Sequence, residues 1–134
     1  MPPAGRRSAR RQAVFILYQQ DLLGLTPQAA LLRDPSAEPG PYARALVLGV
    51  GSHVEEIDRR LAPHLSNWDL KRLGALERSI LRLAAYELLW QDEVPAPVAI
   101  DEAVTLAKRF CSDEAGALVN GVLGGLKTEV DDPR

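Results

Sequence analysis

The sequence predicts an all-α fold of about six or seven helices. Apolar residues recur at spacings of three and four along most of the chain, which is the periodicity of helices with one buried face. No stretch alternates apolar and polar residues as a half-buried strand would, and clusters of proline and glycine separate the periodic segments. With 134 residues, 46% of them hydrophobic, the chain can form one compact domain with a core.

Four arginines open the first predicted helix, which spans Arg6–Leu23 and follows a Pro- and Gly-containing tail at 1–5 that we expect to be mobile. They are Arg6, Arg7, Arg10 and Arg11. Cations at a helix N-terminus oppose the helix dipole and cost about 0.3–1 kcal/mol each, so helix stability does not favour them here. A docked phosphate backbone would offset this repulsion, and arginine can also stack on a base.

Two features separate this helix from the next long one. Thr26 and Pro27 indicate the N-cap and the first turn of a short helix that runs through Leu32. The proline-rich stretch 33–41 then interrupts the helical pattern and marks the end of an N-terminal piece. This piece is too short to fold alone, so the first helix must pack on later ones.

A second long helix is predicted over 42–61. Gly49 and Gly51 in its interior would normally weaken a helix, so they indicate a close helix crossing. Pro63 ends or bends this helix, and a short turn follows in which Trp68 is expected to anchor the core.

Leu73–Gln91 is the stretch around which the other helices are expected to pack. Its apolar positions form a stripe wider than one helix face, which is typical of a central core helix. Its charged residues are expected to form a narrow strip that faces solvent or a partner. They are Glu77, Arg78, Arg82 and Glu87.

Two further helices complete the chain. The prolines within 92–97 break the central helix, and helical spacing resumes over 100–110. Residues 112–114 begin a last helix over 115 to about 127, whose glycines indicate either close approach or an early end. Residues 129–134 are expected to fray.

Charge is distributed unevenly along the chain. The net charge is −2, and residues 1–11 carry +4 from their side chains, which leaves −6 for residues 12–134. A basic arm on an acidic body suggests one surface for polyanions and another for a basic partner. The alternative is a short basic terminus that is merely solvated.

The sequence contains no motif for catalytic, metal or membrane chemistry. Cys111 is the only cysteine, and His53 and His64 are the only histidines, so we expect no internal disulfide and no zinc cluster. Phosphate loops and nucleophile elbows do not occur, so we expect neither an enzyme nor a cofactor. No run reaches about 18 apolar residues and no signal peptide is present, so a cytoplasmic protein is expected.

Several segments, taken in their order and spacing, resemble the NusB family of transcription antitermination factors. The arginine-rich segment 6–13, with Leu17 and Tyr18, resembles the first helix of that family. The other matching segments are Glu77–Leu88 with Val94-Pro95, Ala99–Phe110 and Leu118–Leu123. The likeness covers nearly the whole chain except about 24–41.

This resemblance implies two packed three-helix bundles, expected at about 6–64 and 65–128 of a single domain at 1–134, with flexible tails at 1–5 and 129–134. It implies an RNA-binding factor that binds the boxA sequence of ribosomal RNA leaders together with a small-subunit ribosomal protein, NusE. In the family this complex joins RNA polymerase and suppresses termination during ribosomal RNA transcription. The uneven charge agrees with an arginine arm for RNA and an acidic body for the ribosomal protein.

The resemblance also implies site residues. The residues toward RNA are Arg6, Arg7, Arg10, Arg11 and Tyr18. The residues toward the ribosomal protein are Glu77 and Glu114, with Asp113 and Asp101 as weaker choices by proximity. Leu118 stands where many relatives have phenylalanine, which removes a ring that could stack on a base.

Other functions stay open at this point. The same fold occurs ahead of an RNA cytosine methyltransferase, so the chain could be a stand-alone or truncated accessory domain of such an enzyme. It could also be a helical protein-interaction module with incidental arginines. The oligomeric state is open too, because relatives include monomers and homodimers, and a homodimer could cover the arginine arm.

Overall fold

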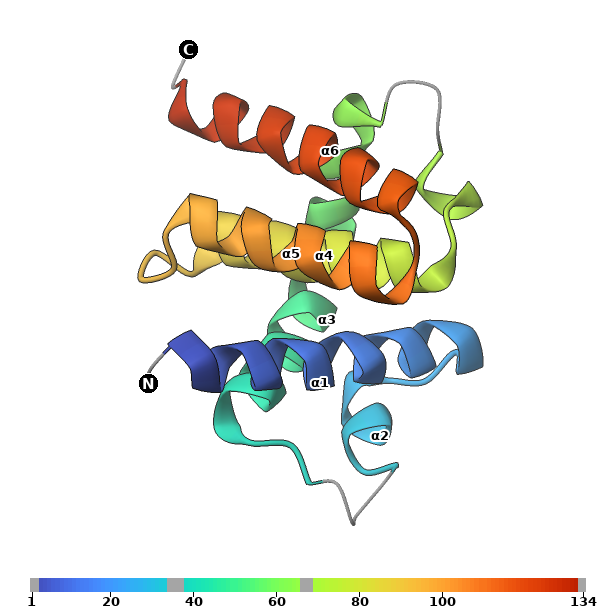
Figure 1. Cartoon of the computed structure of the whole chain (residues 1–134). Coiled ribbons are helices and arrows are strands. Elements are labelled where there is room, and N and C mark those ends of the chain that lie inside the picture. The colour runs from blue at the N-terminus through green and yellow to red at the C-terminus, as the bar shows by residue number, and fades with distance from the viewer. Residues whose placement is uncertain (1–2, 34–37, 66–68, 133–134) are drawn as a thin grey trace.

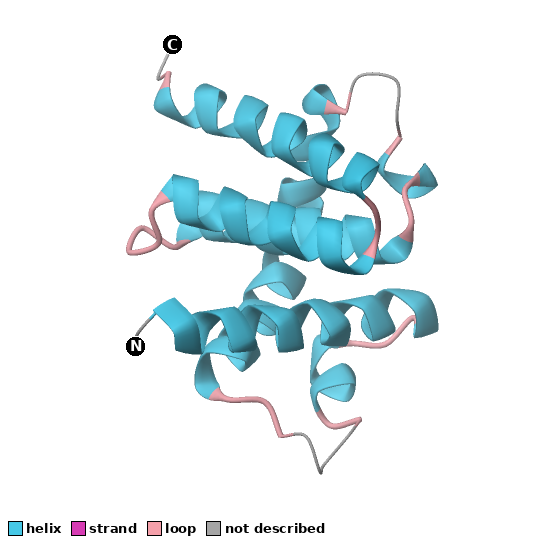
Figure 2. Ribbon diagram, viewed as in Figure 1, coloured by secondary structure: helices cyan, strands magenta, loops and turns pink. Residues whose placement is uncertain are grey.

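A computed structural model describes residues 3–33, 38–65 and 69–132, and the regular structure within these ranges is helical throughout. The α-helices are α1 (Pro3–Leu23), α2 (Pro27–Leu31), α3 (Pro41–Leu61), α4 (Ala75–Trp90), α5 (Ala96–Phe110) and α6 (Asp113–Asp131). Single turns of 3₁₀-helix occur at Ala62–His64 and Leu70–Arg72. Figure 2 shows helices and connecting loops in the described ranges. The predicted all-α class is confirmed.

The helices form two groups that share one interface. Helices α1, α2 and α3 pack on one another, while α5 and α6 pack together and on α4. Figure 1 shows α6, then α4 with α5, then α1 as successive layers, with α2 below α1 and α3 crossing behind. Because α4 also packs against α1 and α3, it joins the two groups. The two-bundle fold is confirmed, whereas the limits at 6–64 and 65–128 stay a prediction.

Helix α4 lies at the centre of the core, as its apolar width predicts. Ile80, Leu81, Leu83 and Ala85 on this helix are each 0–3% exposed. The prediction that all its charged residues face solvent or a partner is wrong at one position, because Glu87 is only 1% exposed. The apolar pattern could not reveal this, since a carboxylate can be buried when a second chain segment supplies a cation.

Several helix ends differ from the predicted ones. Helix α5 begins at Ala96, four residues before the predicted start at 100. Pro97 lies in its first turn, where a missing N–H costs no intrahelical bond. Helix α6 begins with the Ser112 side chain accepting a 3.0 Å hydrogen bond from the Ala115 N–H, and it continues to Asp131 rather than ending near 127. The predicted anchor Trp68 lies outside the described residues.

Close helix crossings occur where the interior glycines of α3 predict them. A Cβ atom on Gly49 would lie 2.2 Å from Tyr86 Cζ on α4. A Cβ atom on Gly51 would lie 2.5 Å from Pro27 Cγ at the start of α2. Both distances are shorter than any real contact, so these two positions admit only glycine without a shift of the neighbour.

None of the helices in the described ranges has both the length and the apolar character that a membrane span requires.

Candidate nucleic-acid interface

The four arginines of α1 face two directions. Residues four apart share a helix face, so Arg6 and Arg10 form one pair and Arg7 and Arg11 form another. Exposure separates the pairs clearly: the Arg10 side chain is 2% exposed, whereas that of Arg7 is 73% exposed. The uniform arginine arm suggested by the sequence therefore consists of an inner pair and an outer pair.

Arg10 forms a buried ion pair with Glu87 of α4. Its Nε donates to both carboxylate oxygens of Glu87, each at 2.9 Å, and the Glu87 side chain is 0% exposed. The Tyr42 hydroxyl of α3 donates to the same carboxylate at 2.6 Å. Burial, together with this hydrogen bond and the negative charge of Glu87, raises the pKa of Tyr42 well above its ordinary value of 10.0. This cluster joins α1, α3 and α4 inside the molecule.

Arg6 lies at the edge of the same cluster. Its guanidinium carbon is 4.7 Å from the centroid of the Tyr42 ring, within the range of a cation–π contact. Its Nη2 donates to Oε1 of Glu93 at 3.0 Å, and Glu93 belongs to the turn between α4 and α5. The Arg6 side chain is 18% exposed, so only part of it can meet a ligand.

The outer pair lies on the surface with Tyr18. Arg7 donates through Nε to Oε1 of Glu102 on α5, at 2.7 Å. Arg11 is exposed and makes no hydrogen bond or ion pair with the described residues. Tyr18 follows Arg11 by seven residues, or about two turns, so it shares that helix face, and it is half-buried. We call Arg7, Arg11 and Tyr18 the outer ridge.

The predicted RNA residues thus fall into three environments. Arg7, Arg11 and Tyr18 lie together on the outer ridge, Arg6 is mostly covered, and Arg10 is buried in an ion pair. Their contact with RNA stays a prediction for all five. The sequence reasoning missed the residues that hold these arginines, which are Tyr42, Glu87, Glu93 and Glu102. The position of Glu87 in a helix whose apolar stripe exceeds one face was the one sequence signal of the buried pair.

The acids predicted to face the ribosomal protein do not all lie together either. Glu77 of α4 and Glu114 of α6 line one pocket of about 240 Å³, together with Leu118 and Arg72. Burial and the negative charge of Glu77 raise the pKa of the nearby Cys111 thiol. Asp113 is exposed beside this pocket at the start of α6. Asp101 is exposed on α5 and is not among the residues that line the pocket.

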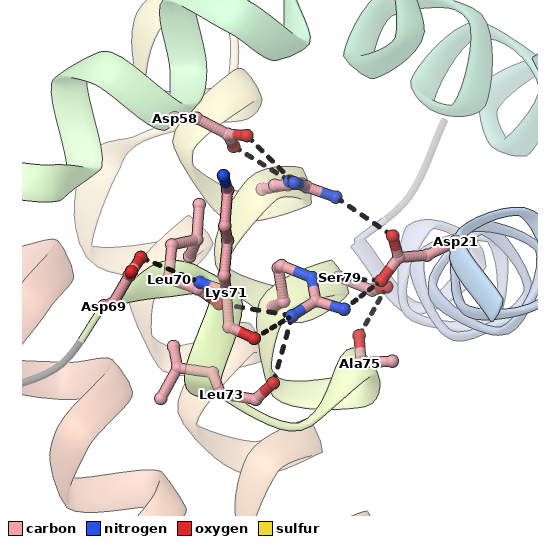
Figure 3. A network of polar contacts seen from close by, with 10 residues as sticks. Asp21, Asp58, Asp69, Leu70, Lys71, Leu73, Ala75 and Ser79 are labelled. Atoms are coloured by element: carbon pink, nitrogen blue, oxygen red, sulfur yellow. Dashed lines mark hydrogen bonds and ion pairs between the residues drawn. The ribbon is translucent and has the colours of Figure 1, made fainter. Parts of the chain in front are cut away.

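A second polar cluster explains the other charges of α4 (Figure 3). Arg78 donates to Asp21 at the end of α1 and to the backbone carbonyls of Leu70 and Leu73. Arg82 forms two 2.9 Å hydrogen bonds with Asp58 of α3. The cluster borders a pocket of about 590 Å³. Its charges are paired within the chain, so it fixes the packing of α1, α3 and α4.

Metal binding has no structural support in the described ranges, where histidine, cysteine, aspartate and glutamate form no group of three or more that could hold an ion.

Comparisons with known proteins agree on one family. The model of the NusB family matches residues 7–128. The transcription antitermination protein NusB of an Exiguobacterium species is 44% identical over 125 residues, which are 92% of this chain and 98% of that protein. The protein of the same name from Bacillus subtilis is 39% identical over 127 residues, covering 94% and 97%.

Solved structures give the same result. A crystal structure of the antitermination factors NusB and NusE in complex with double-stranded RNA contains a similar chain, with a TM-score of 0.82, 31% identity and coverage of 92% and 96%. A structure of T. maritima NusB has a TM-score of 0.83 at 30% identity, covering 96% of this chain and 92% of that one.

Proposed function

This chain belongs to the NusB family, and from that premise we propose that it is an RNA-binding transcription antitermination factor. In this proposal it binds boxA of ribosomal RNA leaders together with the ribosomal protein NusE, and it acts in the cytoplasm on transcribing RNA polymerase. Its relatives carry the name transcription antitermination protein, and one similar chain was solved with NusE and RNA. Neither the methyltransferase accessory domain nor the interaction module gains support from these relatives.

The observation that carries the proposal is the outer ridge. It combines two cationic guanidinium groups with an aromatic ring along about three turns of one helix face. Guanidinium groups can fork onto phosphates, and an aromatic ring can stack on an unpaired base. The inner pair then has a different role, because Arg10 fixes α1 on α3 and α4, and Arg6 extends the basic surface toward the turn after α4.

The acidic pocket suits the protein partner. Glu77 and Glu114 outnumber the one cation of this pocket, Arg72, and Leu118 lines it with apolar surface, which fits a basic side chain with an apolar stem. Asp113 would add charge at the rim. Asp101 stays a weaker choice, because its neighbour Glu102 pairs with Arg7 on the arginine side of the molecule.

Binding of RNA and of NusE requires no covalent bond to form or break, so we propose that this factor is not an enzyme and works without a cofactor. A homodimer is a separate proposal for its regulation, because a second copy could cover the outer ridge.

The RNA test removes the outer ridge charges. The Arg7→Ala, Arg11→Ala double variant should bind boxA RNA more weakly, with the salt dependence of log Kd reduced by about 0.7 for each phosphate that the variant no longer neutralises. The matched control is Arg59→Ala with Lys71→Ala, which removes the same charge from exposed positions outside α1. Equal losses of affinity in both double variants would contradict a specific role of the ridge.

The partner test reverses one charge in the acidic pocket. Adding NusE should tighten boxA binding by the wild-type chain, and Glu77→Lys should reduce this gain without changing the affinity for RNA alone. Glu55→Lys on the exposed side of α3 is the control for the charge change. A full gain in Glu77→Lys would reject the pocket as the NusE site.

A further inference from the structure

The four arginines of α1 have most of their charge balanced by carboxylates in the RNA-free chain. The four arginines contribute +4, and the carboxylates bonded to three of them, Glu87, Glu93 and Glu102, contribute −3, so +4 − 3 leaves +1. The sequence alone suggests a strongly basic arm, because its acids lie about 77 to 95 residues away along the chain. Folding therefore cancels most of the charge that would attract a polyanion.

The other two ion pairs each have one exposed partner. Glu93 is 65% exposed and Arg6 is 18% exposed, whereas Arg7 is 73% exposed and Glu102 is 16% exposed. Glu87 differs, since both it and Arg10 are buried. Arginine forms similar paired contacts with carboxylates and with phosphates, so the carboxylates of Glu93 and Glu102 occupy positions beside Arg6 and Arg7 that suit a phosphate.

We infer that Glu93 and Glu102 limit the RNA affinity of this chain by holding Arg6 and Arg7 until RNA phosphates take their place. This inference rests on the proposed function for the identity of the ligand. It assigns two phosphate positions along the RNA path, one at the turn after α4 and one beside α5. It also gives the two acids a role that the family assignment does not contain: they lower the affinity for RNA of any sequence, because each arginine must leave its carboxylate before it binds a phosphate.

The Arg6–Glu93 and Arg7–Glu102 ion pairs are weak enough for a phosphate to replace the carboxylate. Exposed pairs of this kind change an equilibrium by a factor of only about 1.4–5 each at 25 °C, so a phosphate can displace the carboxylate. A buried pair such as Arg10–Glu87 would not yield in this way, because separating it would leave a charge unpaired inside the molecule. The accessible pairs can thus open while α1 stays docked.

The test neutralises the two acids and compares them with two exposed acids that pair with no arginine. Glu93→Gln with Glu102→Gln should tighten binding to a scrambled RNA by about 2–25-fold and should steepen the salt dependence of log Kd by about 0.7 for each arginine released. The control, Asp92→Asn with Glu55→Gln, removes the same charge from exposed residues that have no arginine partner. It should change Kd by less than about twofold at physiological salt, because neither acid holds an arginine that must be released before a phosphate binds, and salt screens the remaining effect of the removed charge.

Each outcome decides the inference. Unchanged or weaker binding in the glutamine variant would overturn it, and so would an equal gain in the control variant. Glu93→Gln alone, at a 65% exposed position, keeps the test valid if Glu102→Gln affects folding. A boxA RNA is measured alongside: a wild-type chain that does not prefer boxA over scrambled RNA would reject the proposed function, whereas the gain on scrambled RNA tests the two acids independently.

Discussion

Replacement of Arg10 by alanine distinguishes a structural arginine from an RNA contact. The variant leaves Glu87, whose side chain is 0% exposed, with the Tyr42 hydroxyl as its remaining hydrogen-bond donor. Removing one partner of a buried ion pair costs about 3–5 kcal/mol. Since small domains have only about 5–15 kcal/mol of stability, Arg10→Ala should lose a large part of it. Arg11→Ala on the exposed face should cost less than about 0.5 kcal/mol.

Urea unfolding followed by circular dichroism at 25 °C measures both losses on the same scale. A loss below about 1 kcal/mol for Arg10→Ala, combined with a salt dependence of RNA binding reduced by about 0.7, would refute the structural role. Arg10 would then contact phosphate directly, and the buried pair would not persist in solution.

A variant without the buried charges separates stability from RNA binding. Arg10→Met with Glu87→Leu and Tyr42→Phe removes every polar member of the cluster, so no buried group is left unpaired. Such apolar replacements are often neutral or stabilising by about 1–4 kcal/mol. Stability should therefore recover relative to Arg10→Ala, and the salt dependence of RNA binding should equal that of the wild-type chain.

Three further predictions follow from single residues. Gly49→Ala should lower the free energy of unfolding, measured in urea, by about 1–3 kcal/mol, because its Cβ would overlap the Tyr86 ring. A Cβ atom on Gly121 would have no atom within 4 Å, so Gly121→Ala should instead stabilise α6 by up to about 1 kcal/mol. The pKa of Tyr42 is higher in the folded chain than its ordinary value of 10.0, so its contribution to stability is complete below pH 10 and is lost as the pH rises further; Tyr42→Phe should flatten this alkaline loss in melting curves. The raised pKa of Cys111 keeps it a thiol at neutral pH, so iodoacetamide should label it more slowly in the native chain than in urea, and equal rates would contradict this.

The fold could be predicted from local sequence patterns, because the spacing of apolar residues and glycines determines which helix faces pack. The wide apolar stripe of 73–91 correctly predicted a central helix, and the glycines of α3 correctly predicted close crossings at Tyr86 and Pro27. The start of α5 was predicted four residues too late. Proline within 92–97 indicates a helix break, but Pro97 is also well suited to the first turn of a helix, and α5 begins at Ala96.

The site was less predictable, because its organisation depends on contacts distant in sequence. Helical spacing shows that Arg6 and Arg10 share a face, but it does not show which face meets α4. The buried position of Arg10 depends on Glu87, and the pairing of Arg7 depends on Glu102, 95 residues later. A pattern within one helix carries no information on such partners, so the division into inner and outer arginines needed the three-dimensional structure.

The separation of Arg10 from Glu87 also matters during synthesis. The two residues lie 77 positions apart, so at about 5–20 residues per second the ribosome adds Glu87 about 4–15 s after Arg10. During this interval the first helix has no carboxylate to accept its inner arginine, and it carries its full positive charge beside the ribosome's own RNA. We expect the nascent N-terminal segment to be a stronger and less selective polyanion binder than the finished protein. Once α4 and α5 are complete, their carboxylates pair with the arginines, so the unselective binding of polyanions ends when the core forms.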